Sequence, residues 1–147
     1  ASAWEQPNVP AAMMHGYTYS GHALACAAAN ANLDIVTRED LPDNALHVGT
    51  YFQDSLQQLM KYSHVGEVRG KGLMAAVELV ADRATKEMLT PPSPYIQALV
   101  GTSRQEGAMI RVQGNRLILS PPLVFTNAHV DETLRILNIA FSAAENI

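Results

Sequence analysis

The chain has 147 residues, of which 48% are hydrophobic, with 14 acidic against 10 basic side chains and a net charge of -4 at pH 7. It is long enough to bury the core of a domain, and without a run of basic residues it lacks the surface that nucleic acids or a polybasic membrane anchor require. No apolar run reaches the roughly 18 residues of a membrane-spanning helix and no signal segment opens the chain, so we expect a cytoplasmic protein that binds neither nucleic acid nor membrane.

Residues 15–32 read HGYTYSGHALACAAANAN. A polar, glycine-containing stretch runs into an alanine-rich one, which predicts a loop and then a helix over residues 22–36, with Ser20 as its N-cap. The start of a helix leaves backbone N–H donors unpaired and carries partial positive charge, so it can bind an anion. From these residues alone, simple capping of the helix is the commoner explanation. Cys26 falls in the alanine-rich part, where we expect it to be buried.

The middle of the chain contains one helix and two strands. Apolar residues recur at three- and four-residue spacing between residues 44 and 62, which is typical of an amphipathic helix. Strands are predicted at residues 65–68 and 73–80, with glycines in the turn between them. Three prolines mark residues 90–94 as a loop.

The last part of the chain is predicted to form a helix at residues 95–105, ended by a left-handed Gly107, and then a hairpin and a final helix. Short strands at residues 109–112 and 117–119 flank Gly114-Asn115, a pair that favours a tight turn, so Arg111 should lie near the tip of the hairpin. Thr126 is expected to cap the final helix. These elements predict a small α/β domain with a mainly antiparallel sheet covered by helices.

Three blocks of the sequence together resemble a known family. They are HGYTYSGH at residues 15–22, VRGKGLMAAVELV at residues 68–80 and GAMIRVQGNRLILSPPLVFT at residues 107–126. In this order and spacing they resemble the C-terminal third of the class III, pyridoxal-phosphate-dependent aminotransferases, the omega-aminotransferase group. The resemblance implies that residues 1–40 are the tail end of a large cofactor-binding domain. Residues 41–147 would be the C-terminal small domain of a fold-type I pyridoxal-phosphate enzyme.

The resemblance also implies roles for three residues of this chain. Thr18 would donate its hydroxyl and backbone N–H to the phosphate of the cofactor held by the partner subunit of a homodimer, and Tyr17 would lie beside the same phosphate. Arg111 would bind the substrate's carboxylate, which suits a planar guanidinium because it can make two parallel hydrogen bonds. As a residue read by itself, Arg111 could also be an ordinary surface residue of a strand.

The chain departs from the family pattern at two positions. Ala23 follows His22 where the family usually has proline, and Asn115 follows Gly114 where it often has aspartate. Neither change removes a chemical group from the expected site. Both leave the range of substrates open.

The resemblance further implies that the catalytic machinery lies outside this chain. The Schiff-base lysine, the acid that keeps the pyridine nitrogen protonated and the ring that stacks on it all precede the HGYTYSGH block in the family. Lys61, Lys71 and Lys86 lack the expected context, and the chain begins at Ala1 without an initiator methionine. We therefore expect a fragment without a catalytic residue, which binds no pyridoxal phosphate by itself and is inactive alone.

The function implied for the intact protein is the transfer of an amino group between an amine or omega-amino acid and a keto acid. An aminomutase, racemase or decarboxylase of the same fold is the nearest enzymatic alternative. A free-standing, non-catalytic module that self-associates through residues 22–36 is the alternative from another class. The scattered histidines do not form a zinc motif, and Ser20 lacks the G-x-S-x-G sequence of a serine hydrolase, so neither a metal site nor hydrolysis is predicted.

Overall fold

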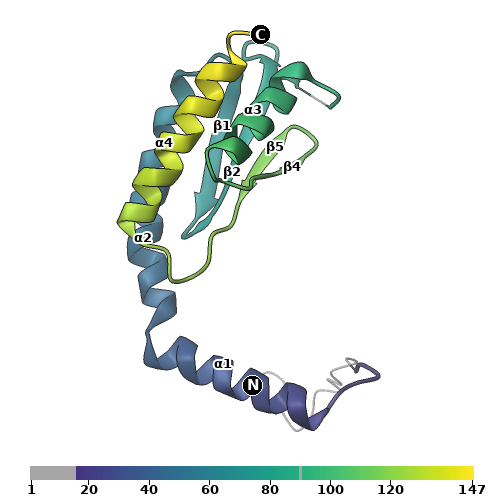
Figure 1. Ribbon diagram of the computed structural model, residues 1–147, viewed down its shortest axis with the longest axis vertical. Helices are drawn as coiled ribbons and strands as arrows, with labels where there is room; N and C mark the ends of the chain where they lie inside the picture. Colours follow the sequence, from purple (N-terminus) through teal and green to yellow (C-terminus); the bar gives the residue numbers. More distant parts are fainter. Residues whose placement is uncertain (1–15, 90) are drawn as a thin grey trace, which may run out of the picture. The chain divides into compact units, whose positions relative to one another are not determined.

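The computed structural model describes residues 16–89 and 91–147, which divide into two compact units with the boundary after Glu39. Helices and strands follow one another in groups, in nearly the order that the sequence predicts. In chain order they are α1 (Ala23–Arg38), α2 (Leu41–Leu56), the 3-10 helix η1 (Gln57–Lys61), β1 (Val65–Lys71), β2 (Met74–Asp82), β3 (Glu87–Met88), α3 (Pro94–Gln105), β4 (Arg111–Gln113), β5 (Arg116–Leu119) and α4 (Asn127–Ala144) (Figure 1).

The helix α1 of the first unit has no buried residue. Leu24 and Leu33 are 75% and 60% exposed, and Cys26 is exposed as well. The prediction that Cys26 is buried is therefore wrong, because the described part of this unit offers α1 no second element to pack against. Its side chains are mostly small and apolar, so the helix exposes an apolar surface to solvent.

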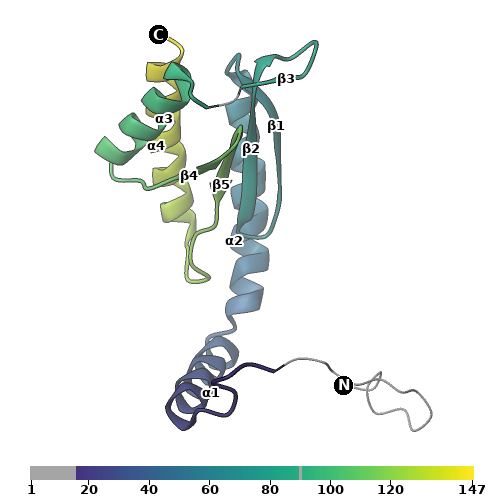
Figure 2. The same cartoon turned by 90° about the vertical axis from the view of Figure 1, so that its right-hand side faces the viewer.

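The second unit is built on an antiparallel sheet with the strand order β1-β2-β5-β4, and β3 pairs with β2. The helices α3 and α4 pack side by side on one face of this sheet, and α2 packs against α4 and β1 (Figures 1 and 2). The predicted α/β fold with a mainly antiparallel sheet covered by helices is confirmed.

The core lies between this sheet and the three helices. On β2, Ala75, Val77 and Leu79 are buried while the residues between them are not, as the two-residue period of a strand requires. Burying each valine or leucine contributes roughly 1.5–3 kcal/mol. The largest fully buried side chains come from α2, η1, the sheet, α3 and α4: Phe52, Leu56, Leu59, Leu79, Leu99, Leu117, Leu137 and Phe141.

Several boundaries differ from their predicted positions. The helix expected at residues 44–62 begins at Leu41, because Pro42 occupies its first turn, where proline is tolerated, and it continues after Leu56 as the 3-10 helix η1. The first strand continues to Lys71, which pairs with Met74, and the second runs from Met74 to Asp82 where residues 73–80 were predicted. Only Gly72 and Leu73 then form the turn, and Gly72 has a φ of 55°. The two-residue strand β3 was missed because it is too short to show a period.

The caps near the end of the chain are confirmed. Gly107 has a φ of 102°, and the N–H of the next residue, Ala108, donates to the carbonyl of Ser103 at 2.8 Å, which ends α3. Thr126 caps α4: its hydroxyl accepts from the backbone N–H of His129 at 3.4 Å, and the His129 Nδ1 accepts in return from the Thr126 N–H at 3.2 Å. This is a capping box with histidine in place of the usual acid or amide.

The hydroxyl of Tyr95 is buried without a hydrogen-bond partner among the residues that the structure describes, and burial raises the pKa of Tyr95. Tyr62 differs, because its hydroxyl lies 3.0 Å from the carbonyl and 2.9 Å from Oδ1 of Asn138, and 3.1 Å from Oγ of Ser142. We expect Tyr95→Phe to raise the free energy of unfolding by about 1 kcal/mol, since it removes an unsatisfied polar group. We expect Tyr62→Phe to lower it by about 1–2 kcal/mol. Urea denaturation of both variants measures these changes, and an equal loss of stability in both would contradict them.

Candidate functional site

A tight turn over residues 17–21 precedes α1. The N–H of Ser20 donates to the carbonyl of Tyr17 at 2.9 Å, and Oγ of Ser20 accepts from the N–H of Tyr17 at 2.9 Å. Gly21 has a φ of 76°, in the left-handed region that glycine adopts without strain. Two hydrogen bonds between Ser20 and Tyr17 therefore close the turn, and Thr18 lies between these two residues.

The N-cap of α1 is His22 and not Ser20, so that prediction is wrong. The Nδ1 of His22 accepts from the N–H of Ala25 at 3.4 Å, and the helix begins at Ala23. Ser20 is two residues too early for this role, because the left-handed Gly21 turns the chain between Ser20 and the first helical residue. The acceptor at the cap is thus a ring nitrogen.

Thr18 lies exposed between the two residues that close this turn. Neither its backbone N–H nor its hydroxyl makes a hydrogen bond with another residue that the structure describes. Tyr17 beside it has a side chain that is 69% exposed. Two adjacent donors on one residue, held by a closed turn, match the oxygens of an anion such as a phosphate. His15, the first residue of the HGYTYSGH block, lies outside the described residues.

Arg111 is the first residue of β4, which is an edge strand of the sheet in the second unit. It pairs with Ile118 of β5, while the turn at Gly114 and Asn115 closes the other end of the hairpin. The prediction that Arg111 lies near the tip is therefore wrong: it lies at the open end, because β4 starts two residues later than expected. Its exposed side chain makes no hydrogen bond or ion pair with any of residues 16–89 and 91–147.

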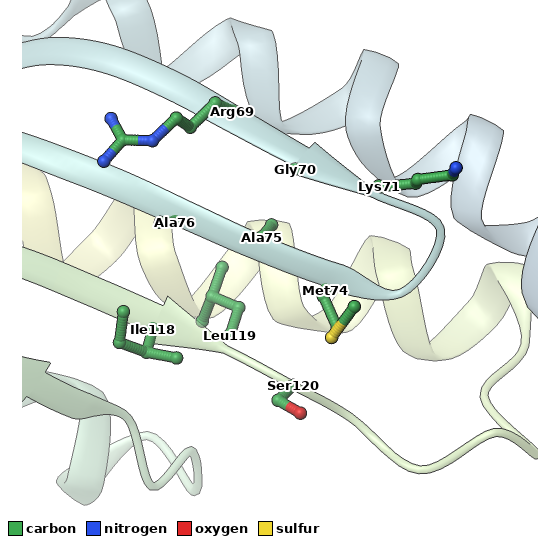
Figure 3. Close-up of a pocket in the computed structure, with 9 residues that line it drawn as sticks. All are labelled: Arg69, Gly70, Lys71, Met74, Ala75, Ala76, Ile118, Leu119 and Ser120. Carbon is green, nitrogen blue, oxygen red and sulfur yellow. The ribbon is translucent and has the colours of Figure 1, made fainter. Parts of the chain in front are cut away.

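Arg111 belongs to the open face of the sheet, which we define as the face opposite α2, α3 and α4. Figure 3 views this face with the helices behind the strands. The pairing places four of its residues in one row across the sheet, in the order Arg69, Ala76, Ile118, Arg111. The adjoining row on the same face is Glu67, Glu78, Arg116, Gln113. The row between these two points into the core.

A hollow of about 560 Å³ lies on the open face next to Arg111's row. Arg69 and Lys71 from β1 stand at its rim, and Met74, Ala76 and Ile118 provide apolar walls (Figure 3). Ile118 is therefore shared, since it lines the hollow and pairs with Arg111. The sequence reasoning missed Ile118, although its place between the inward Leu117 and Leu119 was a usable signal, because alternate residues of a strand face opposite ways.

The two arginines of this row differ in their electrostatic surroundings. The guanidinium nitrogen Nη1 of Arg69 lies 2.6 Å from Oε2 of Glu67 and 2.6 Å from Oε2 of Glu78. Hydrogen bonds from Arg69 and Asn115 lower the pKa of Glu78, and the bond from Arg69 has the larger effect. The bond to Glu78 in turn raises the pKa of Arg69. The charge of Arg69 is thus balanced by two carboxylates, whereas Arg111 has no carboxylate partner among the described residues. A carboxylate that approaches this row is attracted to Arg111.

The three lysines occupy separate places in the second unit. Lys61 ends η1 with its Nζ 5.0 Å from the centre of the Tyr62 ring, Lys71 ends β1, and Lys86 lies in an exposed turn with a φ of 59°. In the part of the chain that the structure describes, no three histidine, cysteine or acidic side chains come together in a way that could hold a metal ion. None of its helices has the length and apolar character needed to cross a membrane.

The chain is similar in sequence to known aminotransferases. The Aminotransferase class-III family matches residues 2–141. The chain is 48% identical over 124 residues to an uncharacterized aminotransferase of Sinorhizobium fredii, a match that covers 82% of this chain and 27% of that protein. It is 38% identical over 133 residues to an omega-aminotransferase of Caulobacter vibrioides, which covers 87% of this chain and 28% of the relative. The chain thus spans less than a third of the length of these two relatives.

A solved structure agrees with these matches. It is an amine transaminase from an uncultivated Pseudomonas species in its PLP-bound form, with a TM-score of 0.83 and 48% sequence identity. The match covers 88% of this chain and 30% of that one. The four helices and the antiparallel sheet described above correspond to the C-terminal portion of the transaminase structure. The resemblance found in the three sequence blocks is confirmed.

Proposed function

The chain belongs to the class III aminotransferase family, and we propose that it forms the C-terminal part of a pyridoxal-phosphate-dependent transaminase. This enzyme transfers an amino group between an amine or omega-amino acid and a keto acid. It works as a cytoplasmic homodimer. Residues 1–40 are the end of its large cofactor-binding domain, and residues 41–147 are its small domain.

The observation that carries the proposal is the closed turn in which the donors of Thr18 have no hydrogen-bond partner among residues 16–89 and 91–147. Its N–H and hydroxyl are the kind of donors that a phosphate accepts, so the donor set fits pyridoxal phosphate. Ser20 holds the turn through its two bonds to Tyr17, each 2.9 Å long. In the homodimer, Thr18 binds the phosphate of the cofactor in the partner subunit, and Tyr17 covers the same group. When bound, the cofactor supplies the electron sink for the carbon that loses or gains the amino group.

Arg111 serves the substrate in this proposal. Its guanidinium binds the carboxylate of a keto acid or an amino acid through two parallel hydrogen bonds. The position supports this role because Arg111 is exposed, lies on an edge strand and has no partner among the described residues. By itself the chain is inactive, since Lys61, Lys71 and Lys86 lack the sequence context of the lysine that carries the cofactor.

Replacing Thr18 tests the proposal in the longer enzyme. We expect Thr18→Ala to raise the dissociation constant for pyridoxal phosphate about tenfold or more, because a hydrogen bond to a charged group is lost. Thr18→Ser keeps the hydroxyl and should remain within about threefold of the unchanged protein. Titration of the cofactor-free enzyme with pyridoxal phosphate, followed by absorbance, measures both. Equal affinities in all three proteins would refute a phosphate-binding role for Thr18.

A further inference from the structure

Asn115, at the turn between β4 and β5, is buried, with only 3% of its surface exposed. Residues at hairpin turns usually lie in solvent. Here the Nδ2 of Asn115 donates to the carbonyl of Leu79 at 2.9 Å and to Oε1 of Glu78 at 3.3 Å. The carbonyl of Asn115 accepts from the N–H of Leu79 at 2.8 Å. Three hydrogen bonds therefore join the tip of the hairpin to β2.

The side chain of Asn115 suits this place chemically. Its single nitrogen carries two hydrogens, and the two acceptors, a carbonyl and a carboxylate, use both. The other carboxylate oxygen of Glu78, Oε2, lies 2.6 Å from Nη1 of Arg69. The bonds from Arg69 and then from Asn115 lower the pKa of Glu78, so that it remains a charged acceptor. The hairpin tip is thus tied to a buried backbone group and to an ion pair at the same time.

We propose that Asn115 is the positioning residue for Arg111, an inference that rests on the proposed carboxylate-binding role of Arg111. The side chain of Arg111 has no polar contact with a described residue, so its place is set by the backbone of β4. That strand is paired only with β5 in the described chain, over three residue pairs. The place of β5 depends in turn on its four pairs with β2 and on the three bonds of Asn115.

Because of strand geometry, a small shift of the hairpin along β2 has a large effect on the position of Arg111. A slip of the hairpin by one residue along β2 would move Arg111 by about 3.3 Å and would exchange the two faces of the hairpin. Arg111 would then point to the core side, and Val112 to the open face. The asparagine bonds resist this slip because they engage both the N–H and the carbonyl of Leu79, which fixes one register. A catalytic or binding group displaced by about 1 Å can already lose up to 100-fold in rate.

The test compares two amino acceptors in the longer enzyme: pyruvate, which has a carboxylate, and propanal, which has none. We expect Asn115→Ala to raise the KM for pyruvate about tenfold while kcat/KM for propanal stays within about twofold. Asn115→Ser keeps one polar hydrogen and should give an intermediate KM. Asn115→Ser also tests the inference if the alanine variant does not fold. Tyr62→Phe is the matched control, since it removes hydrogen bonds to Asn138 in the C-terminal half of α4. It should change the kinetic constants for the two acceptors equally.

Arg111→Ala separates failure of this inference from failure of the proposed role. If Arg111→Ala selectively loses pyruvate while Asn115→Ala behaves like Tyr62→Phe, the positioning role is refuted and the carboxylate role stands. If Arg111→Ala affects pyruvate and propanal alike, the carboxylate role is refuted and the positioning role with it. A selective rise in the KM for pyruvate in both Arg111→Ala and Asn115→Ala supports the inference.

Discussion

Gly49→Ala is expected to lower the free energy of unfolding by about 3 kcal/mol. A Cβ at this position of α2 would lie within 2.9 Å of three backbone atoms of Gly72, in the turn between β1 and β2. A backbone cannot turn aside as the end of a long side chain can. The turn consists of Gly72 and Leu73 alone, and the pairing of Lys71 with Met74 holds both of its ends.

The strain of Gly49→Ala reaches the core because α2 also carries Phe52 and Leu56, whose exposed fractions are 1% and 0%. Moving the helix away from the turn would lift both side chains out of their contacts. The loss outweighs the gain in helix propensity from glycine to alanine, which is about 1 kcal/mol. Urea denaturation followed by circular dichroism measures the difference.

Gly101→Ala is the matched control for this prediction. It makes the same chemical change in the interior of another helix, α3, but the added Cβ would meet nothing within 4 Å. We expect it to raise the free energy of unfolding by about 0.5–1 kcal/mol. A stabilising effect of both substitutions would show that α2 can move off the turn at little cost.

Arg111→Ala in the longer enzyme is expected to lower kcat/KM for pyruvate about 100-fold, because two charge-assisted hydrogen bonds to the carboxylate are lost. The same variant should leave kcat/KM for propanal within about twofold, since propanal has no group for the guanidinium to bind. Arg111→Lys keeps the charge but not the planar pair of donors, so an intermediate loss is expected. Steady-state kinetics with both acceptors measure the three proteins.

The apolar neighbour of Arg111, Ile118, explains why the acceptor without a carboxylate should remain a substrate. Ile118 pairs with Arg111 and lines the hollow of about 560 Å³ together with Met74 and Ala76 (Figure 3). Once the guanidinium is removed, this face becomes more apolar and continues to accommodate an uncharged chain. A parallel fall in kcat/KM for both acceptors would contradict a selective role of Arg111.

Most elements were predictable because their causes are local. The period of buried residues on β2 and the left-handed Gly107 after α3 both act within a few residues of chain. The error at Ser20 has a local cause as well, namely a competing turn: the Ser20 hydroxyl was already used by the N–H of Tyr17. A single sequence shows the acceptor but not which donor it meets.

The tertiary structure alone revealed the contacts between distant segments. The burial of Asn115 against Leu79 depends on the pairing of the hairpin with β2, which brings together residues 36 positions apart. The close approach of Gly49 and Gly72 likewise depends on the packing of distant segments. Nothing in the sequence around Asn115 or Gly49 specifies the distant partner of that residue, because the pairing of the hairpin with β2 and the packing of α2 result from the whole sheet and its helices.

The sequence by itself determined the family, the mixed α/β fold and the order of nearly all helices and strands, because motifs, caps and apolar periods are properties of short segments. It also marked Thr18 and Arg111 as candidates through their motifs. Only the tertiary structure decided that the donors of Thr18 bond to no other described residue, that Arg111 stands at the open end of its hairpin, and that Asn115 joins this hairpin to β2. The physical reason is that hydrogen bonding and burial depend on which distant atoms meet, and those meetings are set by the packed sheet.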